Sequence, residues 1–203
     1  MEIYIVRHGE TIWNKDRRFQ GRTDIPLTME GRRLAQITGA ALEYTHFDKI
    51  FSSPLSRALD TAKLIRGCRN IDIETDDRLK ELSFGLHEGD MYADLIKDDS
   101  LNFKYFFDAP ELYIAKDEGE TLESLISRAG DFMKDKIEPL ADKYERVMIV
   151  AHGALNKAIM SYVKKHPISE FWSGGLQGNC NVIILDYDKG VYTIIDETKK
   201  FYD

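Results

Sequence analysis

Four short hydrophobic runs along the chain predict buried β-strands. The first covers residues 3–6 (Ile-Tyr-Ile-Val), and the fourth covers residues 146–151 (Arg-Val-Met-Ile-Val-Ala). Two further runs, residues 47–51 and 71–75, lie between them. Runs this short and this rich in β-branched residues are typical of strands that are covered on both faces. We therefore expect them to form a largely parallel sheet.

Apolar residues at helical spacing separate these runs. Helices are predicted at residues 28–42, 54–65, 121–144 and 154–163. Thr28 is expected to cap the first helix, and Pro54 suits the first turn of the second. Either Thr121 or Ser124 can cap the third helix, which Pro139 is expected to end or kink. Strands that alternate with helices indicate a parallel sheet with helices on both faces.

The C-terminal part of the chain shows a strand pattern, whereas residues 77–120 show no regular pattern. Residues 181–187 and 191–195 flank Asp188-Lys189-Gly190, a pattern that predicts a β-hairpin. Residues 77–120 are less regular, with short helices expected around 92–96 and 101–107. The predicted fold is a three-layer α/β/α sandwich, with a mostly parallel sheet and an antiparallel C-terminal strand. We expect one domain over residues 1–203, in which residues 84–120 form a lid or specificity segment.

Composition limits the classes of protein to which the chain can belong. Its 203 residues are 43% hydrophobic, which is enough for a sizeable core, and the net charge is −7. This charge argues against a general nucleic-acid or anionic-membrane binder. Cys68 and Cys180 have neither metal-site nor redox spacing, as expected of a reducing compartment. With no signal-peptide pattern and no membrane-length apolar run, we expect a cytoplasmic protein.

Special sequences follow three of the predicted strands. Arg7-His8-Gly9 follows the first, Ser52-Ser53-Pro54 through Arg57 follows the second, and His152-Gly153 follows the fourth. Ligands of open α/β sheets bind beyond the carboxyl ends of the strands. Two histidines and two arginines should therefore meet in one pocket. Burying such a group is costly unless an anion is bound there, and we interpret that anion as a phosphate.

These motifs carry a family resemblance over the chain from residue 3 to the last strand. The motifs are Arg7-His8-Gly9-Glu10-Thr11 with Asn14, Ser53-Pro54-x-x-Arg57-Ala58-x-x-Thr61-Ala62, Glu81, and His152-Gly153. In combination they resemble the histidine phosphatase superfamily, which is also called phosphoglycerate mutase-like.

The resemblance implies catalytic roles for five residues. His8 matches the nucleophile, which becomes phosphorylated on a ring nitrogen. Arg7, Arg57 and His152 match the residues that hold the transferring phosphoryl oxygens, as two guanidiniums and an imidazolium. Glu81 matches the acid/base that protonates the leaving oxygen and then activates water. Because these cations can supply what a metal supplies elsewhere, no metal or other cofactor is expected.

Further residues are expected to bind the substrate. Asn14 and the backbone at Gln20 and Gly21 match additional phosphate donors, Arg22 is a further candidate, and Gly153 permits close backbone approach to the ligand.

Less specific interpretations exist for several of these side chains. A lone histidine such as His8 is often a hydrogen-bonded core residue, and a lone Arg57 would usually be a surface residue. Glu81 lies among acids that are mostly solvated. The aromatic residues between 103 and 113 are more often core than substrate platform.

The sequence favours the phosphatase branch of the superfamily. Residues 81–89 resemble those of α-ribazole phosphatases and broad-specificity phosphatases, although His87 stands where those relatives usually have tryptophan. We therefore predict a metal-independent hydrolase of a small-molecule phosphate monoester that acts through phosphohistidine. The alternatives are a cofactor-dependent phosphoglycerate mutase and a non-catalytic phospho-ligand binding module.

Overall fold

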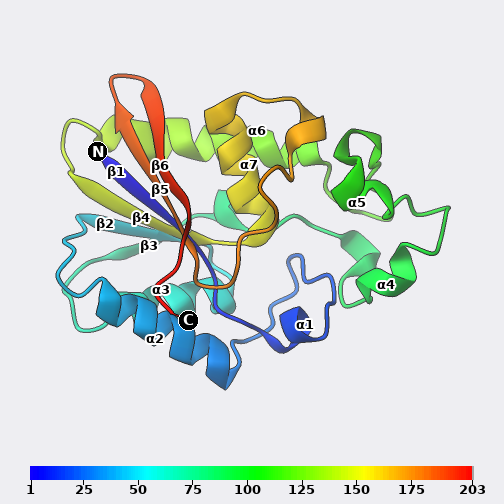
Figure 1. Cartoon of the computed structure of the whole chain (residues 1–203), viewed down its shortest axis with the longest axis horizontal. Coiled ribbons are helices and arrows are strands. Elements are labelled where there is room, and N and C mark those ends of the chain that lie inside the picture. The colour runs from blue at the N-terminus through cyan, green and yellow to red at the C-terminus, as the bar shows by residue number, and fades with distance from the viewer. Residues whose placement is uncertain (203) are drawn as a thin grey trace.

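A computed structural model describes residues 1–202 and shows one six-stranded mixed sheet (Figure 1). The strands are β1 (Glu2–Arg7), β2 (Lys49–Ser52), β3 (Ile73–Thr75), β4 (Arg146–Ala151), β5 (Val182–Asp188) and β6 (Val191–Lys199). Their order across the sheet is β3-β2-β4-β1-β5-β6. The first four are parallel, whereas β5 runs antiparallel to β1 and β6 antiparallel to β5. The predicted fold class is confirmed.

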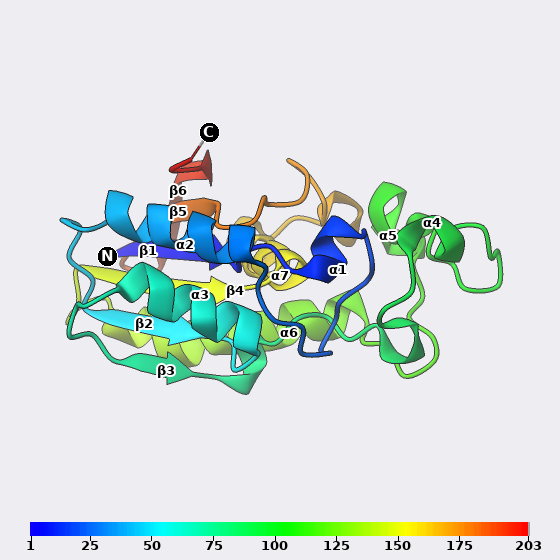
Figure 2. The same ribbon diagram turned by 90° about the horizontal axis from the view of Figure 1, so that it is seen from below.

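Helices cover both faces of this sheet (Figure 2). Because successive side chains of a strand point to opposite faces, Ile3 and Ile5 of β1 belong to one buried cluster and Val6 to another. The helices α2 (Met29–Ala41) and α3 (Ser56–Arg66) complete the cluster around Val6. The helices α6 (Leu122–Phe132) and α7 (Gly153–Lys164) complete the other. The three layers therefore follow from apolar strands that are buried on both sides.

Most element boundaries differ from the prediction by a few residues, and two of the differences involve a proline. Pro54 was expected inside the second helix, but α3 begins at Ser56 with Leu55 as its N-cap. The predicted helix to residue 144 is shorter, because α6 ends at Phe132 and a π-turn (Met133–Ile137) and a 3₁₀ turn (Glu138–Leu140) follow. Pro139 lies in that last turn and lacks the N–H that an α-helix would need there.

Two capping predictions are confirmed. Thr28 accepts a hydrogen bond from the amide of Gly31 at the start of α2. Of the two alternatives for α6, Thr121 is the cap, since its hydroxyl accepts from the amide of Ser124 at 3.2 Å.

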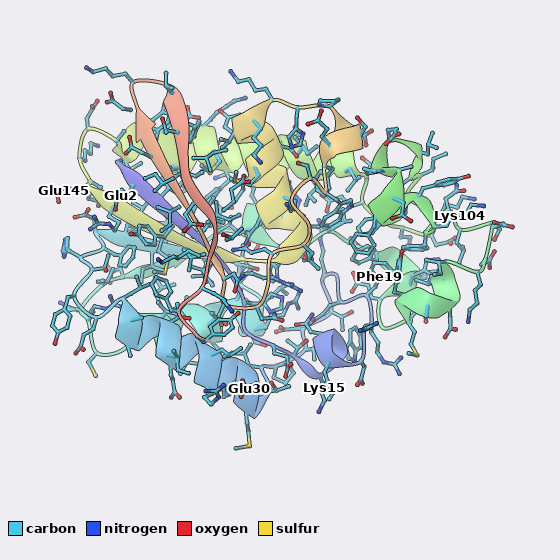
Figure 3. All side chains as sticks on the ribbon, in the orientation of Figure 1. Glu2, Lys15, Phe19, Glu30, Lys104 and Glu145 are labelled. Atoms are coloured by element: carbon cyan, nitrogen blue, oxygen red, sulfur yellow. The ribbon has the colours of Figure 1, made fainter. Side chains whose placement is uncertain are left out.

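Residues 84–120 lie beyond the carboxyl ends of the parallel strands, next to α1 (Ile12–Lys15) (Figure 1). The segment contains the short helices α4 (Tyr92–Leu95) and α5 (Tyr105–Asp108) and two 3₁₀ turns, Gly85–His87 and Pro110–Leu112. A cluster of aromatic rings holds the segment, in which Phe19, labelled in Figure 3, packs against Phe103 and Phe106. Within residues 1–202, no helix combines the length and hydropathy needed to cross a membrane.

Candidate active site

A cavity of about 370 Å³ opens at the carboxyl ends of β1, β2 and β4. Eight residues predicted from the sequence line it: Arg7, His8, Asn14, Gln20, Gly21, Arg57, Glu81 and Gly153. Its other walls include Phe84, Tyr92, Phe106 and Phe107 from the segment 84–120. The side chains that follow separate strands therefore do meet at one place.

His8 follows β1 and is buried, with one ring nitrogen held by the backbone. Its Nδ1 atom lies 2.7 Å from the carbonyl oxygen of Gly9. Because a carbonyl oxygen can only accept, Nδ1 carries the proton and the neutral ring keeps its lone pair on Nε2. Burial, together with the charges of Arg57 and Arg7, holds the pKa of His8 well below its usual range. His8 is therefore a neutral base at pH 7.

The turn after His8 has no room for a side chain at position 9. A Cβ atom at Gly9 would lie 2.5 Å from the carbonyl oxygen of Gly31 in the first turn of α2. This close approach fixes the loop after β1 against α2, and with it the carbonyl group that holds the His8 ring.

Two buried N–H donors in the cavity wall lack partners among residues 1–202. The Nη1 atom of Arg7 donates to the carbonyl oxygen of Gln177 at 2.5 Å, but its Nε has no acceptor. The side-chain oxygen of Gln20 accepts from Thr11 at 2.8 Å, but its Nε2 also has no acceptor. Leaving buried donors unpaired is costly, and both residues belong to the lining of the cavity.

Arg57 is fully buried and is oriented by three hydrogen bonds. Its Nη2 donates to the carbonyl oxygen of Gly21 at 2.6 Å and its Nη1 to that of Thr23 at 2.8 Å, while Nε donates to Nδ1 of His152 at 3.2 Å. A guanidinium has five N–H groups, so two remain for a ligand. Burial lowers the pKa of Arg57 to about 10, and the group stays cationic at neutral pH.

His152 lies next to His8, with ring centroids 5.2 Å apart, but its own role differs from the prediction. Its Nδ1 accepts from Arg57, and its Nε2 lies 2.7 Å from the hydroxyl oxygen of Ser53. A ring that accepts at Nδ1 is neutral, and burial together with the charge of Arg57 holds the pKa of His152 well below its usual range. The expected imidazolium is therefore wrong, because His152 is a neutral acceptor that positions Arg57.

The first turn of α7 holds the carboxylate of Glu81 at the cavity. One oxygen accepts from the amide of Ala154 at 3.1 Å, and the other accepts from the amides of Leu155 and Leu82, each at 3.0 Å. Exposed amides at a helix N-terminus favour a negative charge. The segment that carries His152 thus also orients Glu81.

Comparisons with known proteins agree with this geometry. The sequence model of the histidine phosphatase superfamily (branch 1) matches residues 3–198. The chain belongs to this superfamily. It is 32% identical to a probable phosphoglycerate mutase, GpmB, of Proteus mirabilis over 92% of this chain and 85% of that protein. It is also 27% identical to phosphoserine phosphatase 1 of Hydrogenobacter thermophilus over 86% of this chain and 82% of that one.

A solved structure matches nearly the whole fold. The structure of Bacillus stearothermophilus YhfR superimposes with a TM-score of 0.91 at 34% identity, covering 98% of both chains. Membership of the superfamily and the phosphatase-named relatives confirm the expectation of a histidine phosphatase-type phosphomonoesterase.

One predicted phosphate donor of this histidine phosphatase lies outside the cavity. Arg22 is exposed, and its Nη2 donates to the carboxylate of Glu120 at 3.2 Å. Its amide donates to Glu88 at 2.8 Å. The prediction that Arg22 is a phosphate ligand is therefore not met, because a neighbouring acid of the irregular segment already pairs with it.

Two residues of the site were missed. Asn179 lines the cavity, and its side-chain amide donates to the carbonyl oxygen of His8 at 2.9 Å and to the side-chain oxygen of Asn14 at 3.3 Å. Asn179 precedes β5, the strand that pairs with β1, and no local pattern in the sequence marks it.

Arg128 of α6 was also missed, and it supports Glu81 from behind. Its guanidinium donates to the carbonyl oxygens of Arg78, Lys80 and Glu81, at distances between 2.6 and 2.9 Å. It also binds both carboxylate oxygens of Glu120, at 2.7 and 2.8 Å. No local pattern in the sequence marks Arg128, because α6 also carries the charged residues Glu123 and Asp131.

Proposed function

We propose that this histidine phosphatase is a metal-independent phosphomonoester hydrolase that acts on a small phosphorylated metabolite through a phosphohistidine at His8. The observation that carries the proposal is the hydrogen bond from Nδ1 of His8 to the carbonyl oxygen of Gly9. It leaves the Nε2 lone pair available in a cavity that the guanidiniums of Arg7 and of the fully buried Arg57 also line.

In the first half-reaction, Nε2 of His8 attacks phosphorus and forms a P–N bond, while the P–O bond to the leaving group breaks. The spare N–H groups of Arg7 and Arg57 stabilise charge on the phosphoryl oxygens. Protonated Glu81 gives its proton to the leaving oxygen. Gly9 stabilises the ring, which becomes cationic on phosphorylation, by accepting from Nδ1.

In the second half-reaction, water replaces the leaving group. Ionised Glu81 takes a proton from this water, whose oxygen attacks phosphorus and forms the new P–O bond. The P–N bond breaks, the electron pair returns to His8, and Glu81 is again protonated for the next cycle. Three amides, those of Leu82, Ala154 and Leu155, hold the Glu81 carboxylate in place for this step.

Cationic side chains take the part that a metal has in other phosphoryl-transfer sites. Positioning and charge stabilisation of the phosphoryl oxygens are the main requirements of this reaction. Arg7, Arg57 and Gln20 offer unused N–H groups for both. Hydrolysis should therefore continue in the presence of a chelator.

The test measures phosphate release from p-nitrophenyl phosphate by the wild-type protein and by His8→Ala, each with and without EDTA. We expect chelator-resistant turnover in the wild type and a loss of at least 10⁴-fold in His8→Ala. Equal turnover by the two proteins would refute the mechanism, and loss of wild-type activity on chelation would refute metal independence.

The probable mutase among the relatives supports a second candidate, transfer of the phosphoryl group back to a phosphoglycerate. The same phosphohistidine would serve both reactions, so the acceptor decides between them. A coupled assay with a bisphosphoglycerate primer separates the two. Interconversion that is much faster than phosphate release would replace hydrolysis with mutase activity.

Residues 84–120 are proposed as the specificity segment of the single domain. Four residues of this segment, Phe84, Tyr92, Phe106 and Phe107, line the same cavity as His8. Exchanging this segment should change which phosphate esters are hydrolysed, while His8 is phosphorylated as before.

A further inference from the structure

One cation of the cavity wall has no partner and no part in the proposed chemistry. Arg17 lines the same cavity as His8, and it is exposed, so it lies at the opening. Within residues 1–202, Arg17 is the one arginine whose guanidinium makes neither a hydrogen bond nor an ion pair with another residue.

The backbone holds Arg17 firmly although its side chain is free. Its φ angle is 56°, in the left-handed region that residues other than glycine rarely adopt. Its amide donates to the carbonyl oxygen of Asn14 at 3.2 Å, and its carbonyl oxygen accepts from the amide of Tyr92 at 3.2 Å. The turn is thereby fixed both to α1 and to α4, and it keeps Arg17 at the opening.

The adjacent arginine is occupied. Arg18 also lines the cavity, but its Nη1 donates to the carbonyl oxygen of Gly89 at 2.7 Å and its Nε lies 4.0 Å from the carboxylate of Asp16. Arg18 thus holds the loop, whereas Arg17 keeps all five of its side-chain N–H groups for a ligand.

Both cationic and aromatic side chains line the cavity that contains His8 and Arg17. The cations Arg7 and Arg57 line the cavity together with His8, and six of the other lining residues are aromatic. The aromatic lining residues are Phe19, Phe84, Tyr92, Phe106, Phe107 and Trp172. A leaving group attached to a phosphate at His8 would share the cavity with these rings and with the cation of Arg17.

We propose that Arg17 is a specificity-determining residue that binds a carboxylate on the leaving group of the substrate. The planar guanidinium fork matches a carboxylate with two parallel hydrogen bonds. The substrate class is thus a phosphate monoester whose alcohol carries a compact apolar body and a carboxylate remote from the phosphate. This inference rests on the proposed hydrolysis, which supplies the activity that reports on Arg17.

The experiment compares two pairs of substrates that differ in one charge. The pairs are 4-carboxyphenyl phosphate with 4-carbamoylphenyl phosphate, and the two corresponding 3-substituted esters. For each pair, the ratio of kcat/KM values is measured in the wild type, Arg17→Asn, Arg17→Lys and Lys15→Gln. Asparagine tolerates the left-handed backbone of residue 17, and Lys15 is an exposed cation of α1 outside the cavity wall (Figure 3).

Comparing the ratio between proteins cancels the intrinsic reactivity of each ester and any general loss of activity. We expect the carboxylate/carboxamide ratio to fall at least tenfold in Arg17→Asn for one of the two pairs, mainly through KM. Arg17→Lys should retain part of the preference, and Lys15→Gln should keep the wild-type ratio.

Two outcomes would overturn the inference about Arg17. One is a ratio in Arg17→Asn within threefold of the wild-type value for both pairs, and the other is an equal fall in Lys15→Gln, which would indicate a general field effect. Failure of the wild type to hydrolyse any of the four esters would instead count against the proposed hydrolysis. Titration calorimetry of His8→Ala with 3- and 4-carboxybenzylphosphonate and their carboxamides then tests Arg17 by binding alone, and equal affinities within both pairs would overturn the inference.

Discussion

The Nε atom of Arg57 donates a hydrogen bond to Nδ1 of His152 at 3.2 Å, and this bond fixes the state of both residues. It turns the fully buried guanidinium so that Nη1 and Nη2 reach the carbonyl oxygens of Thr23 and Gly21. It also requires a neutral His152, because a protonated ring has no lone pair to accept with. The motif after β2, which contains Arg57, and the motif after β4, which contains His152, are thus held together by this hydrogen bond.

Replacing His152 tests this positioning role. His152→Ala should lower kcat about 10²–10³-fold, the usual effect of losing one preorganised oxyanion donor, because Arg57 loses its orientation. His152→Asn places an amide oxygen near the position of Nδ1 and should recover at least tenfold of that loss. Steady-state kinetics with p-nitrophenyl phosphate measures both. If His152→Asn were no more active than His152→Ala, the acceptor function assigned to His152 would be wrong.

The protonation of His8 can be followed directly by NMR of its ring protons. Because burial and two arginines lower its pKa, the ring should stay neutral as the pH falls below about 6.5, the usual value of histidine. Removing one of those positive charges in Arg57→Met should raise the pKa toward that value. In wild type, the acid limb of kcat/KM that reflects His8 should accordingly lie well below pH 6.5. A ring that titrates near pH 6.5 or above in the wild type would contradict the neutral nucleophile.

Glu81→Gln separates the two half-reactions. p-Nitrophenolate leaves without a proton, so the variant should still phosphorylate His8 with this substrate. Hydrolysis of the phosphoenzyme needs the base and should slow about 10²–10⁴-fold. Stopped-flow measurements should show a burst of p-nitrophenolate, close to one equivalent per enzyme, followed by slow turnover. A variant with neither burst nor phosphoenzyme, but with an unchanged melting temperature, would remove Glu81 from the second step.

Replacing Arg128 tests whether its contacts with the backbone at Lys80 and Glu81 and with Glu120 stabilise the protein. Arg128→Met leaves the carbonyl oxygens of Lys80 and Glu81 without their donor and Glu120 without the more buried of its two arginine partners. Breaking a largely buried ion pair by removing one partner costs about 3–5 kcal/mol. Chemical denaturation should show a loss of this order, and Arg128→Lys should recover only part of it, since one ammonium cannot reach all these acceptors. An unfolding free energy within about 0.5 kcal/mol of the wild type, the range of ordinary surface substitutions, would contradict this account.

The sequence allowed the sheet and the centre of the cavity to be predicted for one physical reason. Buried parallel strands are recognisable as apolar runs, and their carboxyl ends meet at one edge, so Arg7, His8 and Arg57 could be brought together without knowledge of strand order. The register of β1 against β4 places Arg7 opposite Ala151, next to His152.

Local patterns could not predict contacts that depend on side-chain geometry. Arg22 looked like a phosphate donor, but Glu120, nearly a hundred residues later, pairs with it. His152 looked like a cation until the direction of the Arg57 side chain was known. The aromatic cluster at the cavity depends on contacts of Phe19 with the rings of Phe84, Phe103 and Phe106. No periodicity in the sequence predicts this packing.

The most direct test of the phosphohistidine mechanism is a rapid-quench experiment with a ³²P-labelled phosphate monoester, followed by peptide mapping. The account predicts an acid-labile, base-stable label on His8 that appears within a single turnover and decays at the rate of phosphate release. The label should be absent from His8→Ala and should persist in Glu81→Gln. Steady hydrolysis by the wild-type protein with no label on His8 at any time would contradict the account.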